Sequence, residues 1–252
     1  MSDACPYPAL PPPIQVPLTV VPEHACPYLA GRMAETRAFA TGRFPGELYH
    51  RLMDANFRRS GCVFYQPICR GCRACMQIRI PVERFTASKS QRRCWRRNQD
   101  VTVTAGEPQA TDEKFELYCR YVTQRHDGLM PDERESFEAF LYDSPVDTVE
   151  MCYRDGNGRL LAVGICDVCS KSLSSVYLYF DPDESRRGLG TYGALYEIHL
   201  TRQLGIAYYY LGYWIQGCGT MEYKASFRPY EVLRADGVWG VYEEEPGPAG
   251  RR

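Results

Sequence analysis

The stretch that most constrains this chain runs from residue 176 to residue 228. An alternating apolar run, Val176–Phe180, is followed by the loop Arg186–Gly190, an amphipathic helical pattern and a second apolar run, Ala207–Gly212. Strand, glycine loop, helix and strand form a crossover unit, which places the two strands in one sheet. A glycine loop that opens a helix leaves backbone N–H groups free to bind an anion or a carbonyl oxygen. The sequence therefore predicts a functional site where this loop meets residues 212–228.

The segments before this unit predict further strands and helices. Residues 46–60 show a helical pattern that ends in Arg58-Arg59-Ser60-Gly61, as helix C-termini often do. Two apolar runs, 149–153 and 160–168, flank an Asp-Gly-Asn-Gly turn and predict a β-hairpin. We expect an α/β (α+β) fold in two parts with a boundary near residue 105. Residues 1–105 would form a smaller, basic, cysteine-bearing domain, and residues 106–252 an α/β domain with a mixed sheet.

Composition excludes several classes of protein. The chain has 252 residues, 44% of them hydrophobic and 24% charged, with a net charge of −1, as is ordinary for a globular protein. A nucleic-acid partner would therefore have to be bound by a local patch. No apolar run reaches the length of a membrane span, and the first residues do not resemble a secretion signal. The 12 scattered cysteines indicate a reducing compartment, so we expect a cytoplasmic protein with no membrane partner.

Three of these cysteines are closely spaced. Cys69, Cys72 and Cys75 are separated by two residues each, and Cys26 could supply a fourth thiolate. Thiolates at this spacing can reach one metal, and their softness favours zinc or an iron–sulfur cluster. The alternative is a redox-active or merely buried group, because cysteine also packs well.

The most basic window lies between Arg84 and Asn98. It contains six lysine and arginine residues, no acidic residue, and Trp95 among them. Interleaved arginines and an aromatic ring suit phosphate neutralisation and base stacking. A solvated helix face is the alternative. The residues expected to bind nucleic acid are Arg92, Arg93, Arg96 and Arg97.

The glycine loop resembles the pyrophosphate loop of CoA-dependent acetyltransferases. Gly188 and Gly190 match that pattern, but Ser185 stands where glutamine or arginine is expected. The meander that leads into this unit is similar to the layout of GNAT-like acyltransferases. A plain helix entry without ligand is the alternative for the loop.

Nine motifs together resemble those of the bacterial aminoacyl-tRNA–protein transferases, over roughly residues 15–235. They are His24-Ala25-Cys26-Pro27-Tyr28-Leu29, Phe57-Arg58-Arg59-Ser60-Gly61, Cys69-Arg70-Gly71-Cys72-Arg73-Ala74-Cys75, Ser90-Gln91-Arg92-Arg93, Ser144-Pro145-Val146-Asp147-Thr148, Tyr179-Phe180-Asp181-Pro182-Asp183, Leu189-Gly190-Thr191-Tyr192, Leu211-Gly212-Tyr213-Trp214-Ile215, and Met221 to Pro229. The short length resembles the aspartate/glutamate leucyltransferases rather than the eukaryotic arginyltransferases. The resemblance implies transfer of an aminoacyl group from tRNA to proteins with N-terminal Asp or Glu, which directs them to N-degron degradation. The chain departs from the family pattern at Gly188, where serine is expected.

The chemistry of that reaction suggests roles for particular residues. An aminoacyl ester is already activated, so transfer needs positioning, a proton acceptor and oxyanion donors, and no cofactor. We expect Asp181 to accept the proton and Tyr192 to stabilise the oxyanion or the tRNA terminus. Lys224 and Arg228 would bind the acidic first side chain. The other residues expected to bind substrate are Tyr213, Trp214, Arg187, Gly188 and Gly190.

Alternatives remain open at this point. Asp181 could simply open a turn before Pro182, and Lys224 could sit in a surface ion pair. The donor could be arginyl-tRNA instead of leucyl-tRNA. The chain could also be a non-catalytic thiol-cluster module that binds RNA or senses redox state, or a CoA-dependent acetyltransferase. The residues do not indicate an oligomeric state.

Overall fold

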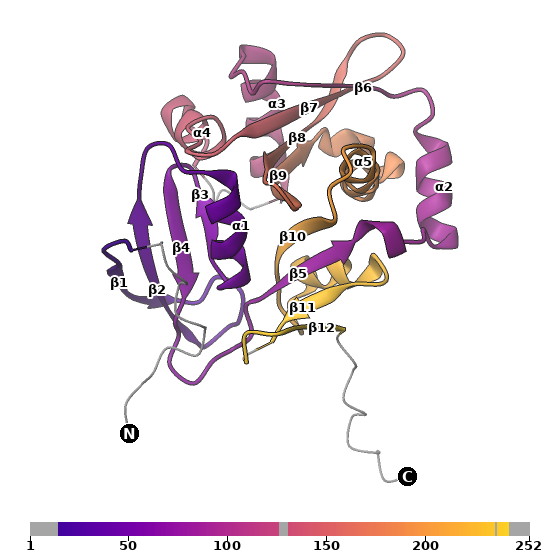
Figure 1. Ribbon diagram of the computed structural model, residues 1–252. Coiled ribbons are helices and arrows are strands. Elements are labelled where there is room, and N and C mark those ends of the chain that lie inside the picture. The colour runs from indigo at the N-terminus through magenta and orange to yellow at the C-terminus, as the bar shows by residue number, and fades with distance from the viewer. Residues whose placement is uncertain (1–14, 126–130, 235, 242–252) are drawn as a thin grey trace.

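The computed structural model describes residues 15–125, 131–234 and 236–241. An eight-stranded mixed sheet forms its centre, with the order β12-β11-β5-β10-β9-β8-β7-β6 (Figure 1). Its strands are β5 (Met76–Pro81), β6 (Thr102–Gly106), β7 (Thr148–Arg154), β8 (Leu160–Val168), β9 (Ser172–Phe180), β10 (Tyr208–Trp214), β11 (Glu231–Leu233) and β12 (Trp239–Val241). Neighbouring strands are antiparallel except β9 and β10, which are parallel. The crossover unit and the mixed sheet are thus confirmed.

A second, antiparallel sheet of four strands has the order β1-β2-β4-β3. Its strands are β1 (Thr19–Ala25), β2 (Met33–Ala40), β3 (Arg58–Ser60) and β4 (Val63–Pro67). Helix α1 (Gly46–Asp54) lies between this small sheet and the large one (Figure 1). The buried side chains of Leu52, Phe57 and Phe64 pack with Tyr210 of β10 in one cluster, which joins the two sheets.

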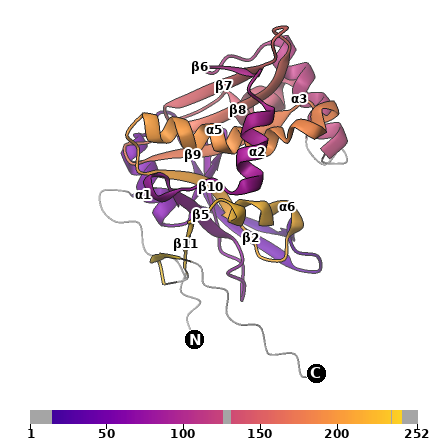
Figure 2. The same ribbon diagram turned by 90° about the vertical axis from the view of Figure 1, so that its right-hand side faces the viewer.

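The remaining helices cover the two faces of the large sheet. They are η1 (Val82–Arg84), α2 (Lys89–Arg97), α3 (Asp112–Arg125), α4 (Arg134–Leu141), η2 (Pro182–Arg187), α5 (Leu189–Gln203), α6 (Gly219–Glu222) and η3 (Tyr223–Ser226). Alternate side chains of β8 point to opposite faces: Val163 and Ile165 pack in the cluster of α3 and α4, and Ala162 and Cys166 in that of α5. Figure 2 shows α2 and α5 in front of the large sheet and the small sheet behind it.

The hairpin between β7 and β8 is confirmed, but the helix predicted to reach residue 60 is wrong. Helix α1 ends at Asp54, and Asn56 follows with φ 64°, a left-handed conformation that ends a helix. Residues 58–60 then form β3 and pair with β4. The division into domains of residues 1–105 and 106–252 stays a prediction. Strands β5 and β6 begin before residue 105, and both belong to the large sheet. The ends of those ranges, residues 1–14 and 242–252, lie outside the described residues.

Within residues 15–125, 131–234 and 236–241, none of the helices combines the length and the apolar character needed to traverse a lipid bilayer.

Candidate functional site

A split opens in the large sheet between its two parallel strands. Among the described residues, β9 and β10 pair only over Ser172–Ser174 and Tyr208–Tyr210. Beyond these residues β9 continues beside β8, and β10 continues beside β5 after a register shift at Gly212. Gly212 has φ 82°, which glycine adopts readily. In open α/β sheets, ligands commonly bind at the carboxyl ends of the strands, and the split lies at that end of the parallel pair.

The Arg58 side chain bridges the base of this split. It is 6% exposed, and its Nη1 donates to Ser174 Oγ at 2.7 Å. Its Nη2 donates to the carbonyl oxygen of Ser175 on the same strand. The guanidinium also lies against β10, because a methyl group added at Gly212 would be 3.4 Å from Arg58 Cζ. No acidic side chain among the described residues forms an ion pair with Arg58, so a buried positive charge stands where the strands part.

Local sequence holds Arg58 in this position through Asn56. The Asn56 Nδ2 donates to the carbonyl oxygen of Cys75 at 2.9 Å, and its Oδ1 accepts from the backbone N–H of Gln77 at 3.2 Å. Tyr213 Oη donates to the Asn56 carbonyl oxygen at 2.9 Å. The turn from α1 into β3 is therefore fixed by β5 and β10, which are distant in sequence.

Lys224 brings a second buried cation to the same region. It is 8% exposed, and its Nζ donates to the carbonyl oxygen of Tyr213 at 2.6 Å. Burial, followed by the charge of Arg58, lowers the pKa of Lys224 to about 7. No described acidic side chain pairs with Lys224, so the alternative of a surface ion pair is wrong. The structure thus brings the predicted residues Lys224 and Tyr213 together with Arg58.

The glycine loop is covered by α2. Gly188 has φ 68° and precedes α5, and its N–H donates to the Ser185 carbonyl oxygen. The Cys94 thiol lies 3.4 Å from the Gly188 carbonyl oxygen, and Asn98 Nδ2 donates to the Arg187 carbonyl oxygen at 3.0 Å. The Gly188 N–H and the carbonyl oxygens of Arg187 and Gly188 therefore already have hydrogen-bond partners within the protein. Substrate binding by Gly188 and Gly190 stays a prediction.

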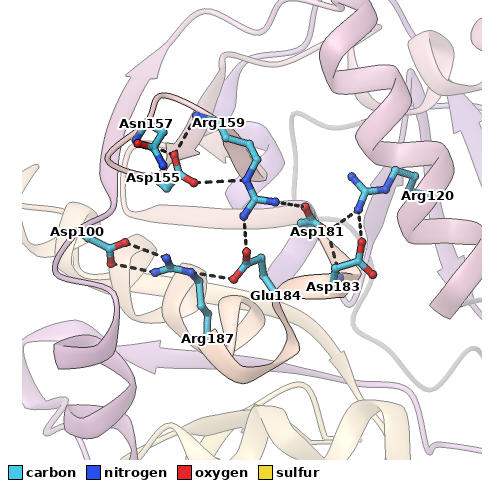
Figure 3. Close-up of polar contacts among 9 residues, drawn as sticks. All are labelled: Asp100, Arg120, Asp155, Asn157, Arg159, Asp181, Asp183, Glu184 and Arg187. Atoms are coloured by element: carbon cyan, nitrogen blue, oxygen red, sulfur yellow. Dashed lines mark hydrogen bonds and ion pairs between the residues drawn. The ribbon is translucent and has the colours of Figure 1, made fainter.

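A network of alternating charges holds the turn before this loop (Figure 3). Asp181 is 1% exposed; its Oδ1 accepts from Arg120 at 2.7 Å and from the Asp183 N–H at 3.0 Å. Its Oδ2 accepts from Arg159 at 3.0 Å. Both oxygens are therefore occupied, and these contacts support the alternative that Asp181 opens the turn. The role of Asp181 as proton acceptor stays a prediction without support from its contacts.

Arg187 belongs to the same network. Its guanidinium donates to both carboxylate oxygens of Asp100, at 2.9 and 2.8 Å, and to Glu184 at 3.0 Å. Figure 3 shows this bidentate pair between Arg187 and Asp100. An acidic ligand would have to displace these partners, so the predicted substrate-binding role of Arg187 stays a prediction.

Three other predicted residues lie around the split in different settings. Tyr192 is buried between α2 and α5, with its ring 5.4 Å from Trp95, centroid to centroid. Trp214 is buried on β10 and lies 6.2 Å from the ring of Tyr230. Arg228 is exposed, with its guanidinium 5.8 Å from the same Tyr230 ring. The described contacts do not join Arg228 to Lys224, so their shared role stays a prediction.

Helix α2 presents its cations to solvent. Ser88 caps the helix through a capping box with Gln91. Trp95 turns inward and stacks on Tyr196 of α5 at 6.4 Å, so it belongs to the packing of the two helices. The exposed cations of the helix are Lys89, Arg92, Arg93, Arg96 and Arg97.

The four predicted metal-ligating cysteines lie in one region. Burial, and then the thiols of Cys69, Cys26 and Cys72, raise the pKa of Cys75 to about 12. Cys75 packs beside Tyr213, so this loop forms a wall next to the site. Thiolates suit zinc and iron–sulfur clusters, but no three metal-ligating side chains in the described residues are arranged to hold a metal ion. A zinc ion or an iron–sulfur cluster on these four cysteines stays a prediction.

An open groove lies on the outer side of this wall. It has a volume of about 630 Å³ and is lined by the cysteine loop and by the residues that follow β10. Its polar and charged lining residues are Tyr28, Arg32, Cys72, Arg73 and Gln216.

Sequence reasoning missed two buried charged residues, Arg58 near Lys224 and Glu197 on α5. Glu197 is 1% exposed and lies on the sheet-facing side of α5, where its Oε2 accepts a hydrogen bond from Tyr209. Burial raises the pKa of Glu197 to about 7. An acidic residue between Leu195 and Ile198 on the apolar side of the helix was the signal that could have identified it.

A mixed sheet with one parallel pair that splits, and a helix that crosses from a glycine loop, define a mixed α/β fold. The C-terminal domain of a putative lysylphosphatidylglycerol synthetase from Agrobacterium fabrum is a similar solved structure. Its TM-score is 0.48 at 14% identity, over 77% of this chain and 65% of that chain.

The sequence places the chain in a family within this class. Residues 24–93 match the arginine-tRNA-protein transferase N terminus, and residues 113–234 match the arginine-tRNA-protein transferase C terminus. The aspartate/glutamate leucyltransferase of Hahella chejuensis is 42% identical over 85% of this chain and 93% of that protein. That of Pseudomonas fluorescens is 42% identical over 83% of this chain and 90% of that protein. The chain therefore belongs to the arginine-tRNA-protein transferase family and is an aminoacyltransferase.

Proposed function

We propose that this protein transfers leucine from leucyl-tRNA to the α-amine of proteins that begin with Asp or Glu, and so marks them for N-degron degradation. The names of its relatives support the donor and the acceptor. The observation that carries the proposal is the pair of buried cations, Arg58 and Lys224, at the split between β9 and β10.

Burial disfavours a positive charge, and the nearby guanidinium of Arg58 disfavours it further at Lys224, so the pKa of Lys224 falls to about 7. A carboxylate ligand would offset both charges, and Arg58 can bind it with a planar, forked guanidinium. An Asp or Glu side chain at the start of a protein carries that carboxylate one or two methylene groups away from the α-carbon. Lys224 and Arg58 would therefore hold the acidic side chain and present the neighbouring α-amine to the split.

The donor would approach from the face that carries α2. The exposed cations of this helix would neutralise phosphates of the tRNA acceptor end, and they lie beside the loop that opens α5. The aminoacyl ester would then enter the split. The groove beside the cysteine loop would give the polypeptide behind the first residue room to leave the site.

The transfer itself requires no cofactor, because the ester bond supplies the activation. A zinc ion or an iron–sulfur cluster on Cys26, Cys69, Cys72 and Cys75 is a separate prediction, and no step of the reaction depends on it. Cytoplasmic location is part of the proposal, since charged tRNA is found there and the described cysteines are free thiols.

The test incubates the purified chain with tRNAs charged with each labelled amino acid and with a peptide that begins with Asp. Label transferred from leucine is the expected result. Label from arginine and not from leucine would assign the chain to the other donor. The same peptide beginning with Asn is the matched control and should stay unlabelled. Binding of tRNA with no product from any donor would contradict the proposal and favour a non-catalytic RNA-binding module.

A further inference from the structure

The part of β9 that has left β10 is accessible to solvent. Residues 175–178 and Phe180 are each partly exposed, whereas every residue of the neighbouring strand β8 from Leu160 to Asp167 is buried. Successive side chains of a strand point to opposite faces, so both faces of β9 are accessible along this stretch. A ligand in the split would therefore contact side chains of β9.

Tyr121 of α3 lies at the free edge of this stretch. Its ring is 6.2 Å from that of Tyr177 and 4.9 Å from that of Phe180, centroid to centroid. Tyr177 packs in the cluster of α3 and α4 and Phe180 in that of α5, so these two rings are on opposite faces of the sheet. The other edge of β9 is paired with β8 as far as Phe180. A ring that contacts both faces must therefore lie at the edge that β10 has left, which is the split.

Helix η3 brings a fourth ring from the other side of the split. Tyr223 begins this helix, after β10, and precedes the buried Lys224. Tyr223 is 49% exposed, yet burial and, to a smaller extent, the neighbouring Tyr121 raise its pKa to about 12. Its side chain is thus accessible to solvent and at the same time close to other protein groups. Tyr223 and Tyr121 therefore lie near each other, one from each side of the split.

The four rings form an aromatic cluster, which consists of Tyr121, Tyr177, Phe180 and Tyr223. Burial raises the pKa of each of its tyrosines, so their hydroxyl groups are neutral at physiological pH. The Arg125 guanidinium lies beside the cluster, 5.5 Å from the centroid of the Phe180 ring. Aromatic rings offer apolar surface to an aliphatic group, and Arg125 would repel a second cation. The cluster therefore suits a branched aliphatic side chain and disfavours a basic one.

The position of the cluster points to the donor. A methyl group added at Gly190, in the first turn of α5, would be 3.4 Å from Phe180 Cε1. This turn follows the loop that α2 covers, and α2 carries the cations proposed to bind the tRNA acceptor end. Arg58 and Lys224, proposed to bind the acidic side chain of the acceptor, lie at the base of the split and on the strand side of β10. The split thus has an aromatic part next to the donor's approach and a cationic part for the acceptor.

We propose that the aromatic cluster binds the side chain of the amino acid carried by the tRNA and so selects leucine. This inference rests on the function proposed above, and it adds the residues that determine the donor. The ligand of the subsite is a branched aliphatic group, held between one ring from η3 and three rings from α3 and β9. A basic side chain at the same place would meet Arg125.

The first test compares kcat/KM for leucyl-tRNA and phenylalanyl-tRNA, with an Asp-starting peptide, in the wild type and in Tyr121→Ala. Removal of the Tyr121 ring enlarges the subsite, so we expect the ratio of phenylalanyl to leucyl transfer to rise by about 10-fold or more, with KM for the peptide unchanged. Tyr208→Ala is the matched control, because it removes a partly exposed ring of β10 where the strands are still paired. Its ratio should equal that of the wild type.

The second test reverses the charge beside the cluster. Arg125 is exposed, so Arg125→Glu should fold normally, and we expect it to raise the ratio of arginyl to leucyl transfer by about 10-fold. Arg43→Glu reverses an exposed charge elsewhere and should leave that ratio unchanged. Melting temperatures measured in parallel show whether each variant folds, and Arg125→Glu decides the matter if Tyr121→Ala does not.

A structural role for the rings would lower transfer from all donors by the same factor. Such a uniform loss in Tyr121→Ala, or an arginyl-to-leucyl ratio in Arg125→Glu equal to that of the wild type, would overturn the inference. Leucyl transfer by the wild type would then still support the proposed function. A wild-type chain that forms no product with any charged tRNA would overturn the proposed function and this inference together.

Discussion

Lys224 and Arg58 lie in one buried region, and neither forms an ion pair with a described acidic side chain. The charge of Arg58 adds to the effect of burial in lowering the pKa of Lys224 to about 7. A carboxylate bound beside these cations would reverse the effect, since an opposite charge favours the protonated form of a lysine. The binding of an acidic N-terminus should therefore be coupled to the protonation of Lys224.

The first prediction follows from this coupling. At pH 8 the free protein holds Lys224 mostly neutral, so binding of an Asp-starting peptide should take up about one proton. Titration calorimetry in buffers of different ionisation enthalpy measures that uptake. The same peptide with N-terminal Asn has the same α-amine and should show no such uptake, and neither should Lys224→Gln with the Asp peptide. Equal proton uptake by both peptides would contradict the coupling.

The second prediction concerns Arg58. Arg58→Gln should raise KM for an Asp-starting peptide by about 100-fold, because one partner of a buried charge pair with the substrate is lost. Arg43→Gln is the matched control: Arg43 is 88% exposed in its surface pair with Asp147, so its loss should leave KM unchanged. Steady-state kinetics with saturating charged tRNA measures KM for the peptide in both variants. The carboxylate subsite would have to be placed elsewhere if both variants kept the wild-type KM.

The third prediction concerns the basic face of α2. Arg92→Ala combined with Arg96→Ala should raise KM for charged tRNA, and the slope of log affinity against log salt should become shallower by about 1.5. Arg43→Ala combined with Arg134→Ala removes the same charge from surface ion pairs and serves as the control. Filter binding at several salt concentrations gives the slopes. Equal slopes for the two double variants would remove α2 from the tRNA interface.

The fourth prediction decides between two roles of Asp181. Its contacts with Arg120 and Arg159 indicate that Asp181→Asn should destabilise the fold, by on the order of 2 kcal/mol because both arginines are about half exposed. Transfer activity of the folded variant at low temperature should remain within a few fold of the wild type. Urea denaturation and initial rates measure the two effects. A large loss of kcat with unchanged stability would instead establish Asp181 as the proton acceptor.

The sequence was sufficient to predict the crossover unit, and it singled out Lys224, which lies buried near Arg58. Both depend on patterns that are local in the chain, namely alternating and helical periodicity and a motif after the last central strand. Arg58 could not be found in this way, because Arg58-Arg59-Ser60-Gly61 has the composition of a helix end. Its real conformation depends on hydrogen bonds from Asn56 to Cys75 and Gln77, which are supplied by a strand that lies later in the sequence.

The orientation of side chains within correctly predicted elements was equally hard to obtain from sequence. Tyr192 lies near the start of α5 as expected, but its ring packs against Trp95 of α2. Asp181 lies in the expected turn, but arginines from α3 and from the β7–β8 hairpin occupy its oxygens. These contacts arise from pairs of residues that are far apart in the chain, and no periodicity in the sequence encodes them.

The last prediction links Glu197 to stability. The pKa of Glu197 is about 7 in the fold against 4.5 ordinarily, so the folded chain retains a proton that the unfolded chain releases between these pH values. Stability from this group is therefore present below about pH 4.5 and is lost as the pH rises through about 7. By pH 8 the loss should be on the order of 3 kcal/mol.

The glutamine of Glu197→Gln cannot ionise. The free energy of unfolding of this variant, relative to that of the wild type, should therefore increase as the pH rises from 5 to 8. Urea denaturation at several pH values measures the difference, and comparison of the two chains cancels the opposite titration of Lys224, which both contain. Glu222→Gln, at an exposed position on α6, is the control and should follow the wild type. Parallel stability curves for wild type and Glu197→Gln would show that the carboxyl group ionises as readily in the fold as in water.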